Sequence, residues 1–195
     1  MRIIAVRGLD RASWKSIFRD CDVLLILGDV GSARVLEEAA ALCKVVVGVA
    51  GRSDDHHIAR VIDSIGYLVE GHLAYIDGLY FGGIGGREPV ANIYSLLREL
   101  GEVKPRSFIL ATYYPPYMVM DYSTLPGARR GLLELHKLYQ YKPLAVVIGE
   151  CMCPGTFYID GILHVCPGSL ATRPSCYSVI EASSGIVTAR VACEV

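Results

Sequence analysis

Five apolar segments of the chain each end in a short polar loop, and these loops carry the side chains that could do chemistry. The loops hold Asp10, the Gly28-Asp29 pair, Gly51 to Asp54, Thr112 to Pro116 and Gly149 to Met152. Loops at strand ends are where α/β proteins place their reacting groups. These loops mix carboxylates with an arginine and two tyrosines, and they lack the histidines that a hydrolytic metal site uses. The layout therefore predicts a functional pocket, whereas the residue types argue against a common metal centre.

The segments that position these loops are expected to be buried strands that alternate with helices. Strands are predicted at 3–6, 23–27, 44–49, 107–111 and 145–148, and helices at 13–19, 32–42, 55–65, 92–100 and 131–140, with Ser13 and Ser32 as N-caps. Residues 67–84 are typical of two or three short antiparallel strands around an Asp77-Gly78 turn, 118–129 of an irregular loop, and residues from 156 onward of antiparallel strands. This order predicts one α/β domain over residues 1–195, a four-layer αββα sandwich of two mixed β-sheets flanked by helices.

Composition and charge narrow the class of protein. Of the 195 residues, 52% are hydrophobic and 20% are charged, which is typical of a globular chain with a large core. The net charge is −1 and no long basic segment occurs, so generic nucleic-acid binding is disfavoured. No apolar segment reaches the ~18–20 residues of a membrane span. The first residues lead directly into a strand pattern without a signal region, and we therefore predict a cytoplasmic protein.

The seven cysteines allow more than one interpretation. Cys21, Cys43, Cys166 and Cys193 lie in or beside apolar segments and are interpreted as small buried hydrophobic residues. Cys151 and Cys153 flank Met152 in a loop, where no second pair stands at zinc-finger spacing, so this motif is weak evidence for a metal. A disulfide there would suit a hyperthermophilic source, and the sequence leaves that point open.

Several motifs occur in the order and at the spacing of a known family. They are LLILGD at 24–29, VGVAGRSD at 47–54, ILATYYPP at 109–116, VIGECMCPG at 147–155 and VCPGSL at 165–170. Together these segments resemble the calcineurin-like metallophosphoesterases, specifically the small type without a cap that bacteria and archaea contain. The resemblance covers nearly the whole chain. It implies that family's αββα fold and the hydrolysis of phosphoesters by two bound divalent ions.

The chain departs from the family at most of its metal-ligand positions. By resemblance, Asp29 stands at the metal-bridging aspartate and Asp54 at the carboxylate that would orient the catalytic histidine. The remaining positions hold other residues, which are Gly8 and Asp10 for the D-x-H pair, Arg52 for the bridging asparagine, Ser53 for the catalytic histidine, Tyr113 for the histidine after threonine, and Glu150 and Met152 for the last two histidines. Glycine and methionine are no ligands for such a site, and an arginine places a permanent cation where a metal should bind. We therefore predict that the two-metal centre is lost and assign no catalytic residue.

Charge balance predicts what stands in place of the metal ions. Without metal, Asp29 would be a buried carboxylate without a partner, which costs several kcal/mol. Arg52, with Arg7 as a second candidate, can supply a planar bidentate cation. Asp10 and Glu150 would complete this Arg–carboxylate network, and no cofactor is then expected. The alternative is a single Mg²⁺ or Mn²⁺ held by the carboxylates of Asp10, Asp29 and Glu150.

The loop after the fourth predicted strand offers a surface for a protein partner. It contains Tyr113, Tyr114, Tyr117, Met118, Met120 and Tyr122. Aromatic and methionine side chains are common at protein interfaces, although the same loop could simply pack on its own sandwich. Non-catalytic relatives of the family, such as the retromer's scaffold subunit and the small subunits of replicative DNA polymerases, act as scaffolds. This is an analogy of fold alone.

The sequence thus predicts a degenerate metallophosphoesterase-fold protein that acts as a scaffold or a regulatory binding module. Its vestigial active-site pocket is expected to contain Asp10, Asp29, Arg52, Asp54, Tyr113 and Glu150. The alternatives are a residual phosphoesterase with one metal ion or none, and a sensor in which Arg52 holds a phosphate or nucleotide. The sequence predicts neither an oligomeric state nor the identity of a ligand or partner.

Overall fold

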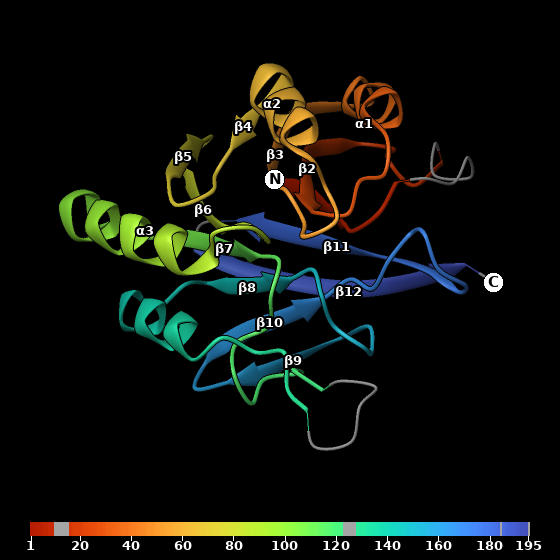
Figure 1. The fold of residues 1–195 in the computed structure, drawn as a ribbon. Coiled ribbons are helices and arrows are strands. Elements are labelled where there is room, and N and C mark those ends of the chain that lie inside the picture. The colour runs from red at the N-terminus through yellow and green to blue at the C-terminus, as the bar shows by residue number, and fades with distance from the viewer. Residues whose placement is uncertain (10–15, 123–127, 184, 195) are drawn as a thin grey trace.

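Two six-stranded sheets packed face to face form the centre of the protein (Figure 1). The structure is a computed structural model, and it describes residues 1–9, 16–122, 128–183 and 185–194. In order across the first sheet, the strands are β12 (Ile186–Glu194), β11 (Ser175–Ser183), β1 (Arg2–Val6), β2 (Cys21–Leu27), β3 (Cys43–Val49) and β4 (Tyr67–Leu68). Across the second sheet they are β5 (Leu73–Ile76), β6 (Leu79–Ile84), β7 (Phe108–Thr112), β8 (Ala145–Ile148), β10 (Ile162–Cys166) and β9 (Gly155–Ile159).

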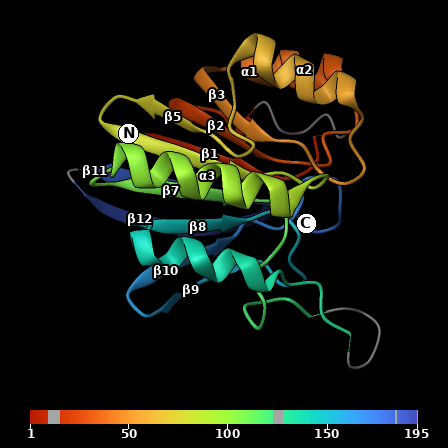
Figure 2. The same ribbon diagram turned by 60° about the vertical axis from the view of Figure 1, so that its left-hand side comes forward.

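Helices cover the outer face of each sheet, which makes four layers (Figure 2). Helices α1 (Ala33–Ala40) and α2 (His56–Ile65) lie on the first sheet, and α3 (Pro89–Val103) and the 3₁₀-helix η2 (Leu133–Tyr141) lie on the second. Three hydrophobic clusters fill the spaces between the layers, one between the sheets and one under each helical pair. The predicted αββα sandwich of two mixed sheets is thus confirmed.

Strand β2 shows why the central strands are continuously apolar. Leu25 and Leu27 point into the cluster between the sheets, whereas Leu24 and Ile26 point into the cluster beneath α1 and α2. Side chains alternate across a strand, so a strand that separates two cores must be apolar at every position. The same reasoning explains why these strands carry no polar residue until their ends.

The carboxyl ends of the parallel strands meet at one edge of the sandwich. Strands β1, β2 and β3 are parallel in the first sheet, and β6, β7 and β8 are parallel in the second. The loops that follow β1, β2, β3, β7 and β8 therefore converge, as the sequence predicts for polar residues at strand ends. This edge holds the candidate site.

Several element predictions need correction. Ser32 stands at the N-cap of α1 but its side chain makes no capping hydrogen bond, and in α2 the cap is Asp55, which accepts from the Ile58 N–H at 2.9 Å.

β4 pairs parallel to β3 instead of joining an antiparallel group, because α2 returns the chain to the same edge. The segment predicted as the last helix is a 3₁₀-helix. Of the helix predicted at 13–19, residues 13–15 and the Ser13 cap lie outside the described residues, and 17–20 form a turn.

The cysteine interpretation was wrong for most of the cysteines. Three disulfides join Cys21 to Cys43, Cys151 to Cys166 and Cys176 to Cys193, and Cys153 is a free, exposed thiol. Neighbouring strands bring two of these pairs together, since Cys21 faces Cys43 in β2–β3 and Cys176 faces Cys193 in β11–β12. Apolar surroundings therefore did not mean isolated thiols. No helix of the described residues is long and apolar enough to cross a membrane.

Candidate functional site

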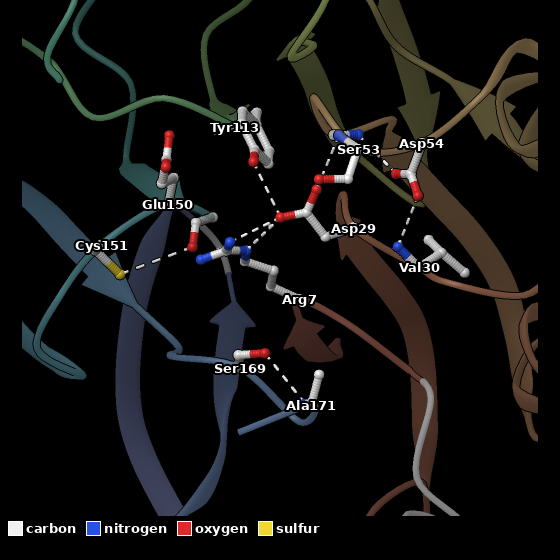
Figure 3. A network of polar contacts seen from close by, with 12 residues as sticks. Arg7, Asp29, Val30, Ser53, Asp54, Tyr113, Glu150, Cys151, Ser169 and Ala171 are labelled. Carbon is white, nitrogen blue, oxygen red and sulfur yellow. Dashed lines mark hydrogen bonds and ion pairs between the residues drawn. The ribbon is translucent and has the colours of Figure 1, made fainter. Parts of the chain in front are cut away.

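Asp29 lies at the centre of a network of polar contacts at the strand-end edge (Figure 3). Its Oδ2 accepts hydrogen bonds from Arg7 Nε at 2.9 Å, Arg7 Nη2 at 2.7 Å and the Tyr113 hydroxyl at 3.0 Å. Its Oδ1 accepts from the Ser53 N–H at 3.3 Å. The side chains of Arg7 and Asp29 are 24% and 17% exposed, so the pair is largely shielded from solvent. Charge-assisted hydrogen bonds of this kind are stronger than neutral ones, especially away from water.

Sheet order places Arg7 and Asp29 together. Arg7 follows β1 and Asp29 follows β2, and these strands are parallel neighbours. The Gly8 N–H donates to the Gly28 carbonyl at 3.1 Å, which extends the pairing past the strand ends. Gly51 on the next loop must be a glycine, because a Cβ there would lie 2.4 Å from Asp29 Oδ1. Close packing of the three loops thus fixes the carboxylate of Asp29.

Tyr113 closes the network from the second sheet. It follows β7, is 3% exposed and packs edge-on against Tyr114 at 4.9 Å between ring centroids. Burial, and then the nearby charges of Asp29 and Glu150, raise the pKa of the Tyr113 hydroxyl well above its usual range. The hydroxyl therefore stays protonated at neutral pH and donates its hydrogen bond to Asp29. A protonated phenol of this kind is a poor metal ligand.

Asp54 ties two loops of the first sheet together. Its side chain is buried, its Oδ1 accepts from the Val30 N–H at 2.8 Å, and its Oδ2 accepts from the Gly51 N–H at 2.7 Å. Burial raises the pKa of this carboxyl, and the two backbone donors counter that effect. Asp54 thus holds backbone in place, where the family resemblance implies that it orients a histidine.

Arg52 does not pair with Asp29, and this prediction was wrong. Its residue is exposed, and within the described ranges no carboxylate lies at ion-pair distance from its guanidinium. Arg7, the second candidate, is the actual partner. The signal for this choice was its position directly after a strand adjacent to β2.

Glu150 does not join the described hydrogen bonds of Asp29. Glu150 forms an ion pair with Arg130, although its N–H donates to the Tyr113 carbonyl at 2.7 Å and so keeps it near the site. Asp10 lies outside the described residues. The sequence reasoning missed Arg130, because Arg130 and Glu150 are 20 residues apart and only the tertiary structure brings them together. The predicted pocket is therefore assembled in part, from Asp29, Asp54 and Tyr113.

A cavity of about 290 Å³ opens beside this network. Asp29, Ser53, Asp54 and His57 are among its lining residues. His57 is exposed in the first turn of α2. His57 is the one histidine among the described lining residues, and the carboxylates beside it are aspartates. Within the described residues, no group of three His, Cys, Asp or Glu side chains is placed to hold a metal ion.

The donor set does not fit the family's two-metal centre. Such a centre needs two cations roughly 3.5–4 Å apart around a bridging carboxylate. Here three protein hydrogen-bond donors occupy Asp29 Oδ2, and two of them belong to the permanently charged guanidinium of Arg7. A dication at the same oxygen would meet the Arg7 guanidinium at contact distance, and the repulsion would be large.

Comparisons with known proteins place the fold. No protein-family model and no curated protein sequence matched the chain. Among solved structures, phosphopantetheinyl hydrolase from Mycobacterium tuberculosis has a TM-score of 0.64 at 13% identity, over 85% of this chain and 88% of that one. An archaeal phosphodiesterase has a TM-score of 0.52 at 12% identity, over 98% and 100% of the two chains. Vps29 from Entamoeba histolytica has a TM-score of 0.54 at 12% identity, over 100% and 99%. The chain has the fold of the calcineurin-like metallophosphoesterases.

Proposed function

We propose that this chain is a degenerate metallophosphoesterase-fold protein without the two-metal centre, and that it acts as a scaffold or regulatory binding module. One observation carries the proposal, namely that the carboxylate of Asp29 is bound by Arg7, Tyr113 and the Ser53 N–H. These donors supply positive charge and hydrogen bonds to the carboxylate oxygens that would coordinate metal ions in the family's site. Both Arg7 donors bind the same oxygen, Oδ2, and the single positive charge of the guanidinium balances the single negative charge of the carboxylate.

The segment from Tyr113 to Tyr122 supports the binding role. Tyr117, Met118 and Tyr122 are 38%, 67% and 66% exposed, whereas Tyr113 is buried in the site at the other end of the segment. The segment is held from beneath by Asp121, which is fully buried, accepts from the Met118 N–H at 2.9 Å and pairs with an arginine at 2.6 Å. A braced loop that presents aromatic and methionine side chains suits a protein interface.

Metal content and hydrolysis test the loss of the two-metal centre. We expect the purified protein to retain less than one equivalent of Mg, Mn, Fe or Zn by elemental analysis after dialysis. We also expect no hydrolysis of bis-(p-nitrophenyl) phosphate with any of these ions. Stoichiometric metal that disappears in Asp29→Ala but persists in the exposed control Asp63→Ala would refute the proposal. EDTA-sensitive hydrolysis that is lost in Asp29→Ala and kept in Asp63→Ala would instead support the phosphoesterase alternative. Asp10 would then be the next ligand to test.

The partner surface is tested by quantitative co-purification from the native source. The single variants Met118→Asp and Tyr122→Ser should each reduce recovery of a stoichiometric partner, while the exposed control Tyr94→Ser on α3 should not. Both variants alter exposed side chains, so their unfolding temperatures should match the unmodified protein. A partner recovered equally well with all three variants would remove this loop from the proposal.

A second candidate function rests on Arg52. Its cation is exposed at the rim of the network and has no carboxylate at ion-pair distance in the described part of the chain. An arginine with free donors is a common phosphate ligand, so a phosphate or nucleotide sensor is the alternative. Arg52→Ala should then abolish the calorimetric signal of nucleotide binding, and an unchanged signal would count against the sensor.

The cytoplasmic location is part of the proposal. Three disulfides persist in an intracellular protein chiefly in hyperthermophiles. The cytoplasmic location and the disulfides together therefore imply such a source. Fractionation of the native cells with thiol labelling before lysis would test the location and the oxidation state together.

A further inference from the structure

We infer that a second pocket, on the far side of Arg7 from Asp29, binds the phosphate group of a small phosphomonoester. The pocket has a volume of about 300 Å³, and Arg7, Ser169, Thr172 and Arg173 are among its lining residues. Two of its described lining residues are arginines and none is an aspartate or glutamate. It is distinct from the cavity at Ser53 and His57, and Arg52 does not line it.

Among the described residues, no hydrogen-bond partner is bound to the remaining guanidinium nitrogen of Arg7. Its two hydrogen bonds to Asp29 use Nε and Nη2, and Figure 3 shows its third guanidinium nitrogen directed away from Asp29. An arginine carries five N–H donors in a fixed plane. Asp29 holds that plane in one orientation, so the outward edge is presented to a ligand without further loss of side-chain entropy.

The loop that carries Ser169 and Arg173 is fixed to Arg7. The Leu170 N–H donates to the Arg7 carbonyl at 2.9 Å, and the Cys176 N–H donates to the Ser169 carbonyl at 3.0 Å. Within the loop, the Thr172 hydroxyl donates to the Ser169 carbonyl at 3.1 Å. These bonds hold the pocket in shape before any ligand arrives.

Ser169 and Arg173 supply the remaining donors. The Ser169 Oγ accepts from the Ala171 N–H at 3.1 Å, which leaves its own O–H proton for a ligand oxygen. Arg173 is exposed, and no described carboxylate lies at ion-pair distance from it. Asp29 offsets the charge of Arg7, and Arg173 therefore gives the pocket a net positive charge. Two arginines and a serine thus line one pocket, and guanidinium and hydroxyl donors are the groups that bind a tetrahedral oxyanion.

The other wall of the pocket is apolar and favours an ester over free phosphate. Met152, Pro154 and Pro174 line it, and Met152 is 53% exposed. A phosphate occupies only part of about 300 Å³, so the apolar wall can contact the organic group of a monoester. The inference does not depend on whether the chain hydrolyses phosphoesters, since it concerns a different pocket.

Calorimetric titration with phenyl phosphate at low ionic strength tests the inference. We expect saturable binding that is weakened about tenfold or more in Arg173→Ala and partly restored in Arg173→Lys, because one charge-assisted contact is lost. The exposed control Arg98→Ala, on α3, and Arg52→Ala should bind as the unmodified protein does. Inorganic phosphate should bind more weakly than phenyl phosphate.

Four outcomes of these titrations would contradict the inference in whole or in part. Absence of saturable binding at millimolar phenyl phosphate, or unchanged affinity in Arg173→Ala, would refute the inference that this pocket binds the phosphate group. Loss of binding in Arg52→Ala alone would move the ligand to the rim of the Asp29 network and support the sensor instead. Equal affinity for inorganic phosphate and phenyl phosphate would overturn the monoester assignment. Amide chemical shifts of residues 168–176 should move on titration, and unfolding temperatures should show that each variant folds.

Discussion

Two strand-end carboxylates, Asp29 and Glu150, each pair with an arginine. The two ion pairs differ in how the surrounding protein holds them. Asp29 has four protein donors and an arginine that is 24% exposed. Glu150 pairs with Arg130, which is 50% exposed, in a loop that the Cys151–Cys166 disulfide anchors to β10. The two carboxylates are similarly shielded, at 17% and 15% exposed, so the sites differ in the exposure of the arginine, in the number of hydrogen bonds and in the disulfide beside Glu150. We therefore expect the two arginine–carboxylate pairs to contribute differently to the free energy of unfolding.

Removing the disulfide next to Glu150 should have the largest effect on stability. The Cys151–Cys166 link closes a loop with a sequence separation of 15, and Cys151→Ser combined with Cys166→Ser should lower the free energy of unfolding by about 3 kcal/mol. Urea denaturation monitored by circular dichroism would measure this. Without reductant, a thiol titration of the denatured unmodified protein should find Cys153 alone. Two or more reactive thiols would contradict the pairing and this contrast.

Breaking the Asp29 pair should come next. Arg7→Met leaves a shielded carboxylate without its cation and should cost about 2–3 kcal/mol of unfolding free energy, reduced from the value for a fully buried pair because both side chains are partly exposed. Adding Asp29→Asn to this variant should recover part of the loss. The single variant Asp29→Asn completes the cycle, and losses that simply add in the double variant would show that the pair carries no specific coupling.

Removing one neutral donor at the same oxygen should have a smaller effect. Tyr113→Phe deletes the hydroxyl that donates to Asp29 at 3.0 Å and keeps the buried ring, so we expect a loss of about 1–1.5 kcal/mol. Thermal and urea unfolding would measure it, with Tyr94→Phe as an exposed control. An unchanged stability would mean that water replaces the hydroxyl and that the site is more open than its burial indicates.

Breaking the Glu150 pair should have the smallest effect. Arg130→Ala removes an ion pair whose cation is half exposed, and exposed pairs contribute about 0.2–1 kcal/mol. Stability measured in low and high salt should differ only slightly between this variant and the unmodified protein. If Arg130→Ala were as damaging as Arg7→Met, the two carboxylates would be equivalent after all.

The sequence predicted the fold and part of the site for identifiable reasons. Residues such as Leu24 and Leu25 face separate cores, so β2 had to be continuously apolar, and the polar residues had to appear where it ends. Asp29, Asp54 and Tyr113 were therefore placed correctly at one edge. The partner of Asp29 was not settled by the sequence, because Arg7 and Arg52 both follow strands adjacent to β2, and only the folded structure shows that Arg7 pairs with Asp29.

The amino-acid sequence by itself determined the order of buried strands and polar loops, and the residue types at the former ligand positions. Both follow from local pattern, since periodicity and residue chemistry can be read along the chain. Tertiary structure alone decided that Arg7 binds Asp29, that Arg130 binds Glu150, and that six cysteines pair. These contacts depend on which strands are neighbours and how closely their loops pack, and the spacing of residues along the chain does not specify those distances.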